Sequence, residues 1–146
     1  MTTLVTFLTD RLAQDPTVAG SKGSALARMV GAGLPAPDGF VVTTQALQAI
    51  NPPELQKLLA QLEGVPVTDV DAISQVSTLV RDAIQGVHLD AALLEAIKAA
   101  HQRLQSDSVS VRSSATAEDL ADASFAGQYE SFLNVLSFDG VVLRVR

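Results

Sequence analysis

The sequence contains no cysteine among its 146 residues. Disulfide bonds and thiol chemistry are therefore excluded, and this absence weakly favours the cytosol, so we expect a cytoplasmic protein. The chain also lacks any run near the roughly 18 consecutive apolar residues that a membrane-spanning helix needs. Residues 1–16, MTTLVTFLTDRLAQDP, have no basic stretch ahead of their apolar part, so we expect no signal peptide.

Positive charge and aromatic residues are both scarce. Ten lysines and arginines face sixteen acidic residues, which gives a net charge of −6. We therefore expect no nucleic-acid partner, and an anionic ligand would need a local positive site against the overall field. Only 4% of the residues are aromatic, so alanine, valine and leucine must supply the core, which suits helices packed on a sheet.

The pattern of apolar residues predicts a mixed fold of the α+β class. One helix is expected over residues 23–30, and three more are expected to begin at Asn51, within the capping segment Thr68–Asp71, and at Asp90. In the helix that follows Thr68–Asp71, Val70 is expected to face inward. Short strands are expected over Phe40–Thr43, Ser108–Arg112 and Gln128–Leu136. In the second of these strands, Val109 and Val111 face one way and Arg112 the other.

The stretch VAGSKG, residues 18–23, has the composition of an anion-binding turn. A glycine-rich turn runs straight into a helix, where free backbone N–H groups and the helix dipole favour negative charge. Lys22 adds a mobile point charge that can reach phosphate oxygens. The spacing differs from that of a Walker A loop. A turn with a solvated lysine is the alternative interpretation.

The stretch VRSSATAED, residues 111–119, is the second polar segment. Arg112 ends a strand, and a strand end is a rigid mount for a guanidinium that grips phosphate. The hydroxyls of Ser113, Ser114 and Thr116 follow it as donors and acceptors. The alternative is a capped turn, because Thr116 and Asp119 also have the spacing of a helix capping box.

The two stretches have a common design. Each places one cation beside small polar residues at the edge of regular structure, and Gly127 would let a backbone approach a ligand closely. A pair of this kind could hold a polyphosphate.

Two long segments, VAGSKGSALARMVGAGLPAPDGFVVTT and VRSSATAEDLADASFAGQYESFLNV, resemble a known domain. It is the N-terminal nucleotide-binding domain of the pyruvate phosphate dikinase and phosphoenolpyruvate synthase (pyruvate, water dikinase) family, which rifampicin phosphotransferases share. The resemblance runs from about residue 16 to about residue 136. It implies the N-terminal part of an ATP-grasp fold that binds ATP. In the family, a phosphoryl group then passes to a histidine on a separate domain, and on to pyruvate or another acceptor.

The resemblance also assigns cofactor-binding residues. The phosphate-binding lysine and arginine of the family fall on Lys22 and Arg112, and positions near the nucleotide fall on Gly127, Ser131 and Phe132. Charge and geometry single out Lys22, Arg112 and Gly127 independently, whereas Ser131 and Phe132 rest on the resemblance alone. No catalytic residue and no metal ligand is assigned within the chain.

The sequence departs from the family at two places. Ser21 stands where the family has a second glycine, and residues 137–146 do not resemble the next helix of the family. We therefore expect a partial nucleotide-binding domain over 1–136 and an atypical tail over 137–146. The resemblance implies that the Mg²⁺ ligands lie outside this chain. It also implies that the missing half of the domain, the phosphohistidine domain and the acceptor domain are its partners. His88 and His101 are expected to be structural.

Three functions from different classes remain open. The chain is the ATP-binding portion of a phosphoenolpyruvate synthase-like phosphotransferase, a non-catalytic nucleotide or phosphate binder left by truncation, or an interaction module. The first is preferred. We expect no catalysis by this chain alone, because phosphoryl transfer needs a metal and an in-line acceptor.

Overall fold

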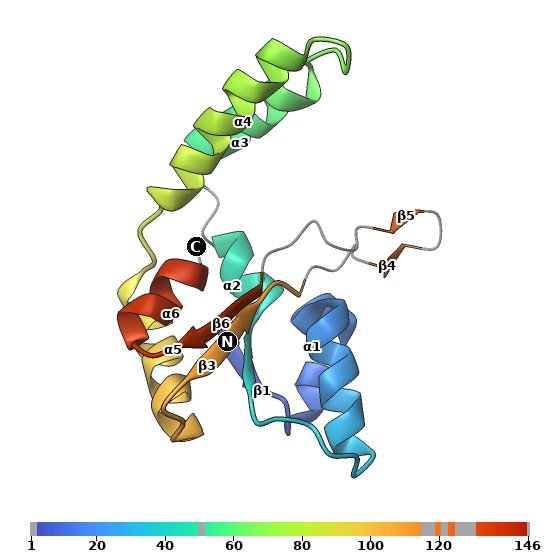
Figure 1. Ribbon diagram of the computed structural model, residues 1–146, viewed down its shortest axis with the longest axis vertical. Helices are drawn as coiled ribbons and strands as arrows, with labels where there is room; N and C mark the ends of the chain where they lie inside the picture. The colour runs from blue at the N-terminus through green and yellow to red at the C-terminus, as the bar shows by residue number, and fades with distance from the viewer. Residues whose placement is uncertain (1–2, 50–51, 115–118, 121–122, 125–130, 146) are drawn as a thin grey trace. The chain divides into compact units, whose positions relative to one another are not determined.

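The computed structural model describes residues 3–49, 52–114, 119–120, 123–124 and 131–145. The chain divides into two compact units. Unit 1 joins residues 1–48 to residues 90–145, and unit 2 comprises residues 49–89. Helices and small antiparallel sheets make up the described chain (Figure 1), which confirms the expected α+β class.

The first sheet of unit 1 pairs strand β1 (Val5–Phe7) with strand β2 (Phe40–Val42). The pairing is antiparallel and places Phe7 opposite Phe40, with their ring centroids 6.2 Å apart. Strand β2 confirms the expected strand at Phe40–Thr43. Thr43 follows it, fully buried, and its hydroxyl donates to the carbonyl of Thr3 and accepts from the N–H of Ala46, in helix α2 (Thr44–Ala49).

The second sheet of unit 1 pairs β3 (Val109–Arg112) with β6 (Ser131–Val135), again antiparallel. The register is irregular, because Val111 faces Phe132 while Val109 faces Val135, so β6 holds one extra residue. Asn134 has φ of 56° there, a left-handed conformation that asparagine tolerates better than most residues. The expected regular alternation along Gln128–Leu136 is therefore interrupted by a bulge.

A third pair of short strands, β4 (Asp119–Leu120) and β5 (Ala123–Ser124), lies between β3 and β6 in the sequence. Asp119 thus belongs to a strand and not to the first turn of a helix. The capping-box alternative for this segment is wrong for Asp119, and Thr116 lies outside the described residues.

Helices cover the sheets of unit 1 on two sides. Helix α1 (Pro16–Gly31), preceded by the short 3-10 helix η1 (Arg11–Gln14), packs on one side, and α5 (Ala91–Leu104) and α6 (Phe138–Val145) pack on the other (Figure 1). The core on the α1 side consists of Leu8, Ala13 and Ala27, with Leu26, Val30 and Val41 packed against them. Small residues make up the buried face of α1, which lets the helix lie close to its neighbours.

Helix α6 falls within the segment that was expected to be an atypical tail. The hydroxyl of Ser137 accepts from the N–H of Gly140, as a helix-capping residue does. Val141 is buried, and the ring of Phe138 lies 6.2 Å from the ring of His101 on α5. The segment is thus an integrated helix of unit 1, whereas the domain boundary at residue 136 stays a prediction.

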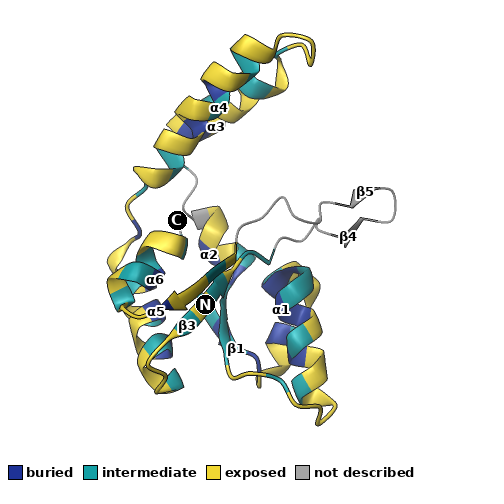
Figure 2. Ribbon diagram, viewed as in Figure 1, coloured by how far each residue is buried: buried dark blue, intermediate teal, exposed yellow. Residues whose placement is uncertain are grey.

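Unit 2 is a pair of amphipathic helices, α3 (Pro53–Glu63) and α4 (Val70–Gln85). Leu55, Val76 and Val80 are the buried residues between them, as the narrow buried strip in Figure 2 shows. The start of α4 is capped as expected, since the carboxylate of Asp69 accepts from the N–H of Ala72. The expectation that Val70 faces inward is wrong, because this first residue of α4 is 71% exposed.

Candidate functional site

Helix α1 contains a break at Gly20, inside the first of the two polar stretches. Gly20 has φ of 68° and ψ of 178°, in a region of backbone space that is essentially restricted to glycine. The helix therefore consists of a short segment up to Ala19 and a longer one that restarts at Ser21. Lys22 consequently lies in the first turn of the longer segment, at the junction where the sequence predicted it.

The shorter segment has its own cap. The carboxylate of Asp15 accepts from the backbone N–H of Thr17 at 2.8 Å and from the Thr17 hydroxyl at 2.7 Å. The hydrogen bonds from the Thr17 side chain and backbone favour the charged carboxylate and lower the pKa of Asp15 below its usual value. The sign is that of a depressed acid, so this cap stabilises the fold above the ordinary aspartate pKa, and its contribution is lost as pH falls through the lowered value.

Ser114 connects the two polar stretches. Its hydroxyl accepts from the N–H of Gly23 at 2.8 Å and donates to the carbonyl of Ala19 at 2.6 Å, across 91 and 95 residues of sequence. The approach is so close that a Cβ built on Gly20 would lie 1.6 Å from the carbonyl oxygen of Ser114. The structure therefore brings the turn that carries Lys22 into direct contact with the segment that follows Arg112.

Arg112 and Ser131 lie directly opposite each other on neighbouring strands. Arg112 is the last residue of β3 and Ser131 the first of β6, and they are paired in the antiparallel register. Side chains of such a pair project from the same face of the sheet. Both are exposed, and Arg112 has no ion-pair partner among the residues that the structure describes. A guanidinium and a hydroxyl are thus presented together at the end of this sheet.

Phe132 projects from the other face of this sheet, because adjacent strand residues alternate. It pairs with Val111, is half-buried, and lies under the guanidinium of Arg144, whose carbon is 4.8 Å from the ring centroid. The structure does not bring Phe132 to the face that holds Arg112 and Ser131. Gly127, the remaining candidate residue, lies outside the described residues, as does Glu118.

The two histidines occupy different surroundings. His88 is exposed, with Nδ1 3.0 Å from the carbonyl of Gly86, in unit 2. His101 is half-buried on α5 against Phe138. Among the described residues, no three histidine, cysteine or acidic side chains gather as a metal site would need, and none of the described helices has the length and apolar character to cross a bilayer.

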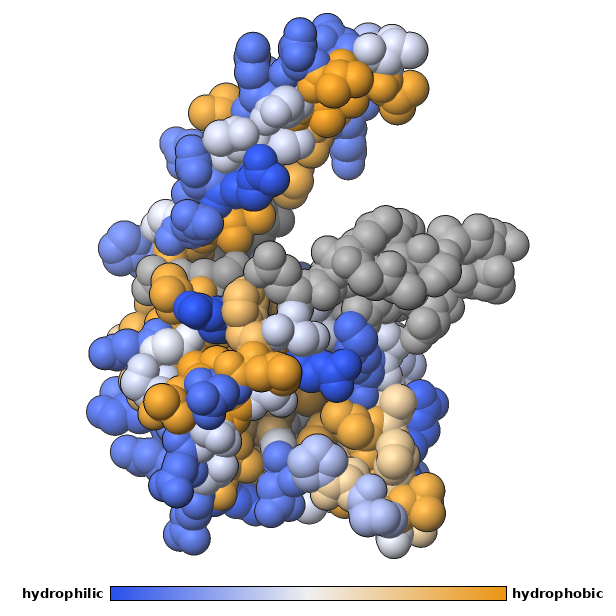
Figure 3. Space-filling model, viewed as in Figure 1, coloured by the Kyte–Doolittle hydropathy of each residue, from blue (hydrophilic) through white to orange (hydrophobic). Residues whose placement is uncertain are grey.

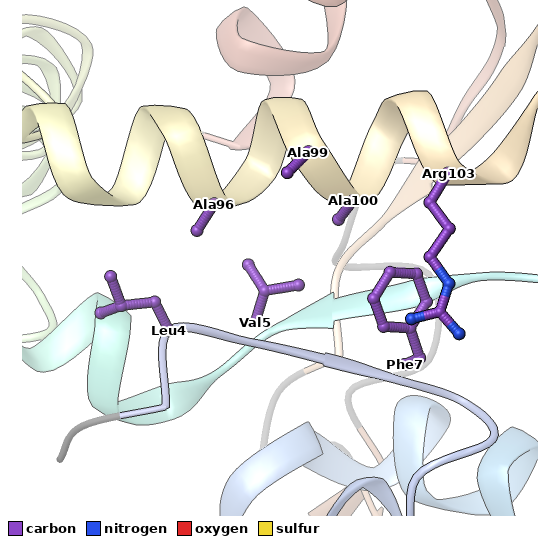
Figure 4. A pocket seen from close by; sticks show the side chains of 7 residues that line it. All are labelled: Leu4, Val5, Phe7, Ala96, Ala99, Ala100 and Arg103. Carbon is purple, nitrogen blue, oxygen red and sulfur yellow. The ribbon is translucent and has the colours of Figure 1, made fainter.

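A separate groove lies between β1 and α5 in unit 1. Leu4, Val5 and Phe7 line one wall, and Ala96, Ala99, Ala100 and Arg103 line the other (Figure 4). The guanidinium of Arg103 stacks on the ring of Phe7 at 3.9 Å from its centroid. The residues that line this groove are largely apolar and include none of the candidate phosphate ligands.

Sequence reasoning placed Ser114 only in a general group of hydroxyls, and its contact with Gly23 was missed. The one indirect sequence signal for this contact is the glycine at position 20, because glycine tolerates both a positive φ and the close approach of another backbone.

The comparisons with known proteins all indicate the same family. Residues 16–146 match the family described as the AMP/ATP-binding domain of pyruvate phosphate dikinase. The chain is 38% identical over 141 residues to a protein of Methanocaldococcus jannaschii named a probable phosphoenolpyruvate synthase. It is also 37% identical to the phosphoenolpyruvate synthase of Deinococcus radiodurans and 36% identical to that of Escherichia coli.

These alignments cover most of this chain and little of the relatives. They span 91%, 90% and 87% of this chain, but only 12%, 18% and 17% of the respective relatives. The part of this chain that matches the family runs to residue 146 and therefore includes α6.

The Gly20 break generates a prediction about stability. Gly20→Ala should lower the free energy of unfolding by about 3 kcal/mol or more, because the methyl group is strained at this φ and collides with the Ser114 carbonyl. Gly33→Ala is the matched control, since Gly33 also has a positive φ of 74° but open space where a Cβ would lie. It should cost about 1 kcal/mol. Equal losses in urea unfolding would contradict the close packing at Gly20.

Arg112 generates a second prediction. Because the side chain is exposed and not ion-paired within the described residues, Arg112→Ala should change the free energy of unfolding by less than about 0.5 kcal/mol. Arg103→Ala should cost more, about 1 kcal/mol, through the lost stacking on Phe7. A loss of several kcal/mol in the Arg112 variant would show instead that this arginine is structural, as part of a buried ion pair with Glu118 or Asp119.

Proposed function

Because the chain belongs to the family of pyruvate phosphate dikinase AMP/ATP-binding domains, we propose that its polar junction binds the phosphates of ATP. The proposed site consists of the turn around Lys22 and the facing strand ends that carry Arg112 and Ser131. One observation carries the proposal: the Ser114 hydroxyl holds these two parts of unit 1 together. Figure 3 shows hydrophilic surface over the end of α1 that carries this turn.

The donor set suits a polyphosphate. A guanidinium can offer two parallel N–H donors to one phosphate, and an ammonium on a flexible stem can follow a second one. The hydroxyl of Ser131 adds a donor directly opposite Arg112. We assign these groups to binding and orientation of the phosphates. Gly127 and Phe132 stay in the proposal on the family resemblance alone.

The wider reaction is also a proposal. Relatives that carry this region are named phosphoenolpyruvate synthases. We infer that the chain is the N-terminal part of a cytoplasmic ATP-grasp domain, which supplies ATP for phosphoryl transfer to a histidine on another domain and then to pyruvate or a similar acceptor. Mg²⁺ in the complete domain would neutralise charge on the transferred phosphate. The phosphorylated histidine is assigned to another domain on the family resemblance alone.

A second candidate function is favoured by a specific surface. Leu133 and Leu136 near the bulge of β6 are 74% and 69% exposed, and Leu143 on α6 is 61% exposed. Figure 3 shows apolar surface over this part of unit 1. Exposed apolar residues in this number mark contact surfaces more often than isolated ones do. The alternative is therefore a non-catalytic interaction module that binds phosphate or another chain.

The phosphate site predicts a weak, charge-driven affinity for ATP. Calorimetry on the chain should give a Kd of about 1 mM, which weakens as salt rises because salt screens charge attraction near the protein surface. Tripolyphosphate should bind similarly and adenosine should not. Lys22→Ala should weaken binding at least about threefold, whereas Lys57→Ala, the same charge change at an exposed position of α3, should leave it unchanged.

Two results would contradict the proposal. If the affinity for ATP changed neither with salt nor in Lys22→Ala, the chain would not recognise ATP through its phosphates. Tight, magnesium-dependent binding of ATP by these 146 residues would contradict the assignment of the metal and adenine sites to other parts of the domain.

A further inference from the structure

The longer segment of α1 lacks a cap of its own. The first N–H groups of a helix have no acceptor within the helix, and the residue before the first turn usually supplies one from its side chain. Here that residue is Gly20, which has no side chain. The N–H of Gly23, the third residue of the restarted helix, is instead satisfied by Ser114 at 2.8 Å.

Ser114 thus acts as a helix cap from a distant part of the chain. It occupies the space that a side chain at position 20 would fill, since a Cβ there would lie 2.6 Å from the Ser114 hydroxyl oxygen. The same hydroxyl donates to the carbonyl of Ala19, on the other side of the break. One side chain therefore satisfies a donor and an acceptor that the break in α1 leaves without helical partners.

The hydroxyl proton of Ser114 is fully used by this arrangement. A serine hydroxyl has one proton, and here it is directed to Ala19 at 2.6 Å. It is therefore not available as a donor to a phosphate oxygen. Ser114 is, however, only two residues beyond Arg112, and its partner Gly23 is adjacent to Lys22.

We propose that Ser114 is a positioning residue, which holds the Lys22 turn at a set place relative to the guanidinium of Arg112. This inference rests on the proposed phosphate site, since Ser114 acts through the two cations and not on the ligand. The covalent connection to each cation is short: one peptide unit separates Gly23 from Lys22, and two separate Ser114 from Arg112. Loss of the hydroxyl releases the turn and separates the cations without removing either charge.

The test compares Ser114→Ala with a matched capping control. Asp90→Ala removes a hydrogen bond of the same type in unit 1, from the N–H of Leu93 at 2.7 Å, at the start of α5. Both variants should lose similar stability in urea. Only Ser114→Ala should speed amide exchange of Gly23, by up to about tenfold, as expected for one lost hydrogen bond. Ser114→Thr keeps the hydroxyl and should retain the protection of this amide.

The second measurement is affinity for tripolyphosphate, by NMR titration at a temperature where every variant is fully folded. Ser114→Ala should weaken binding about tenfold, Asp90→Ala should leave it unchanged, and Ser114→Thr should bind within about threefold of the wild type. Unchanged affinity in Ser114→Ala, with the wild type binding, would overturn the positioning role alone. Failure of the wild type to bind tripolyphosphate would overturn the proposed phosphate site and this inference with it.

Discussion

The two hydrogen bonds of the Ser114 hydroxyl are the interaction on which the polar junction of unit 1 depends. It joins the broken helix α1 to the end of strand β3 through one bond accepted from Gly23 and one donated to Ala19. A backbone N–H or C=O that is buried without a partner costs about 1–3 kcal/mol, so a break in a packed helix needs such compensation. The serine supplies it on both sides of the break. Because Lys22 follows the break and Arg112 precedes the serine, this contact is the basis of the proposed positioning of the two cations.

The bulge in β6 is the second constraint, and it decides which side chains share a face. Phe132 and Val135 are three residues apart, so regular alternation would direct them to opposite faces of the sheet. The extra residue at Asn134 lets both lie opposite valines of β3. Val135 is buried as a result, and Phe132 lies beneath Arg144. The other face keeps Arg112 and Ser131 in the solvent, where a charged ligand can reach them.

The helices and strands with strong local signals could be predicted from the sequence. Asp69 and Asp90 accept from the N–H groups of Ala72 and Leu93, as the capping signals indicated. Strand β3 has the expected alternation, with half-buried valines and an exposed Arg112. Helices α2 and α6 were not predicted, because each is short, with six and eight residues, and depends on packing more than on intrinsic propensity. The same dependence on context left Val70 exposed.

The sequence by itself determined the membership of the family, the α+β class, and the placement of Lys22 at a helix start and Arg112 at a strand end. The membership follows from the likeness of two long segments to the family, and the rest from residue types and short-range periodicity, which a chain carries wherever it folds. Only the tertiary structure decided that Ser114 caps a helix 91 residues away, that Gly20 must make room for it, and that Phe132 faces away from Arg112. The physical reason is that a long-range hydrogen bond and a one-residue bulge leave no periodic trace in the sequence, yet each fixes which polar groups meet.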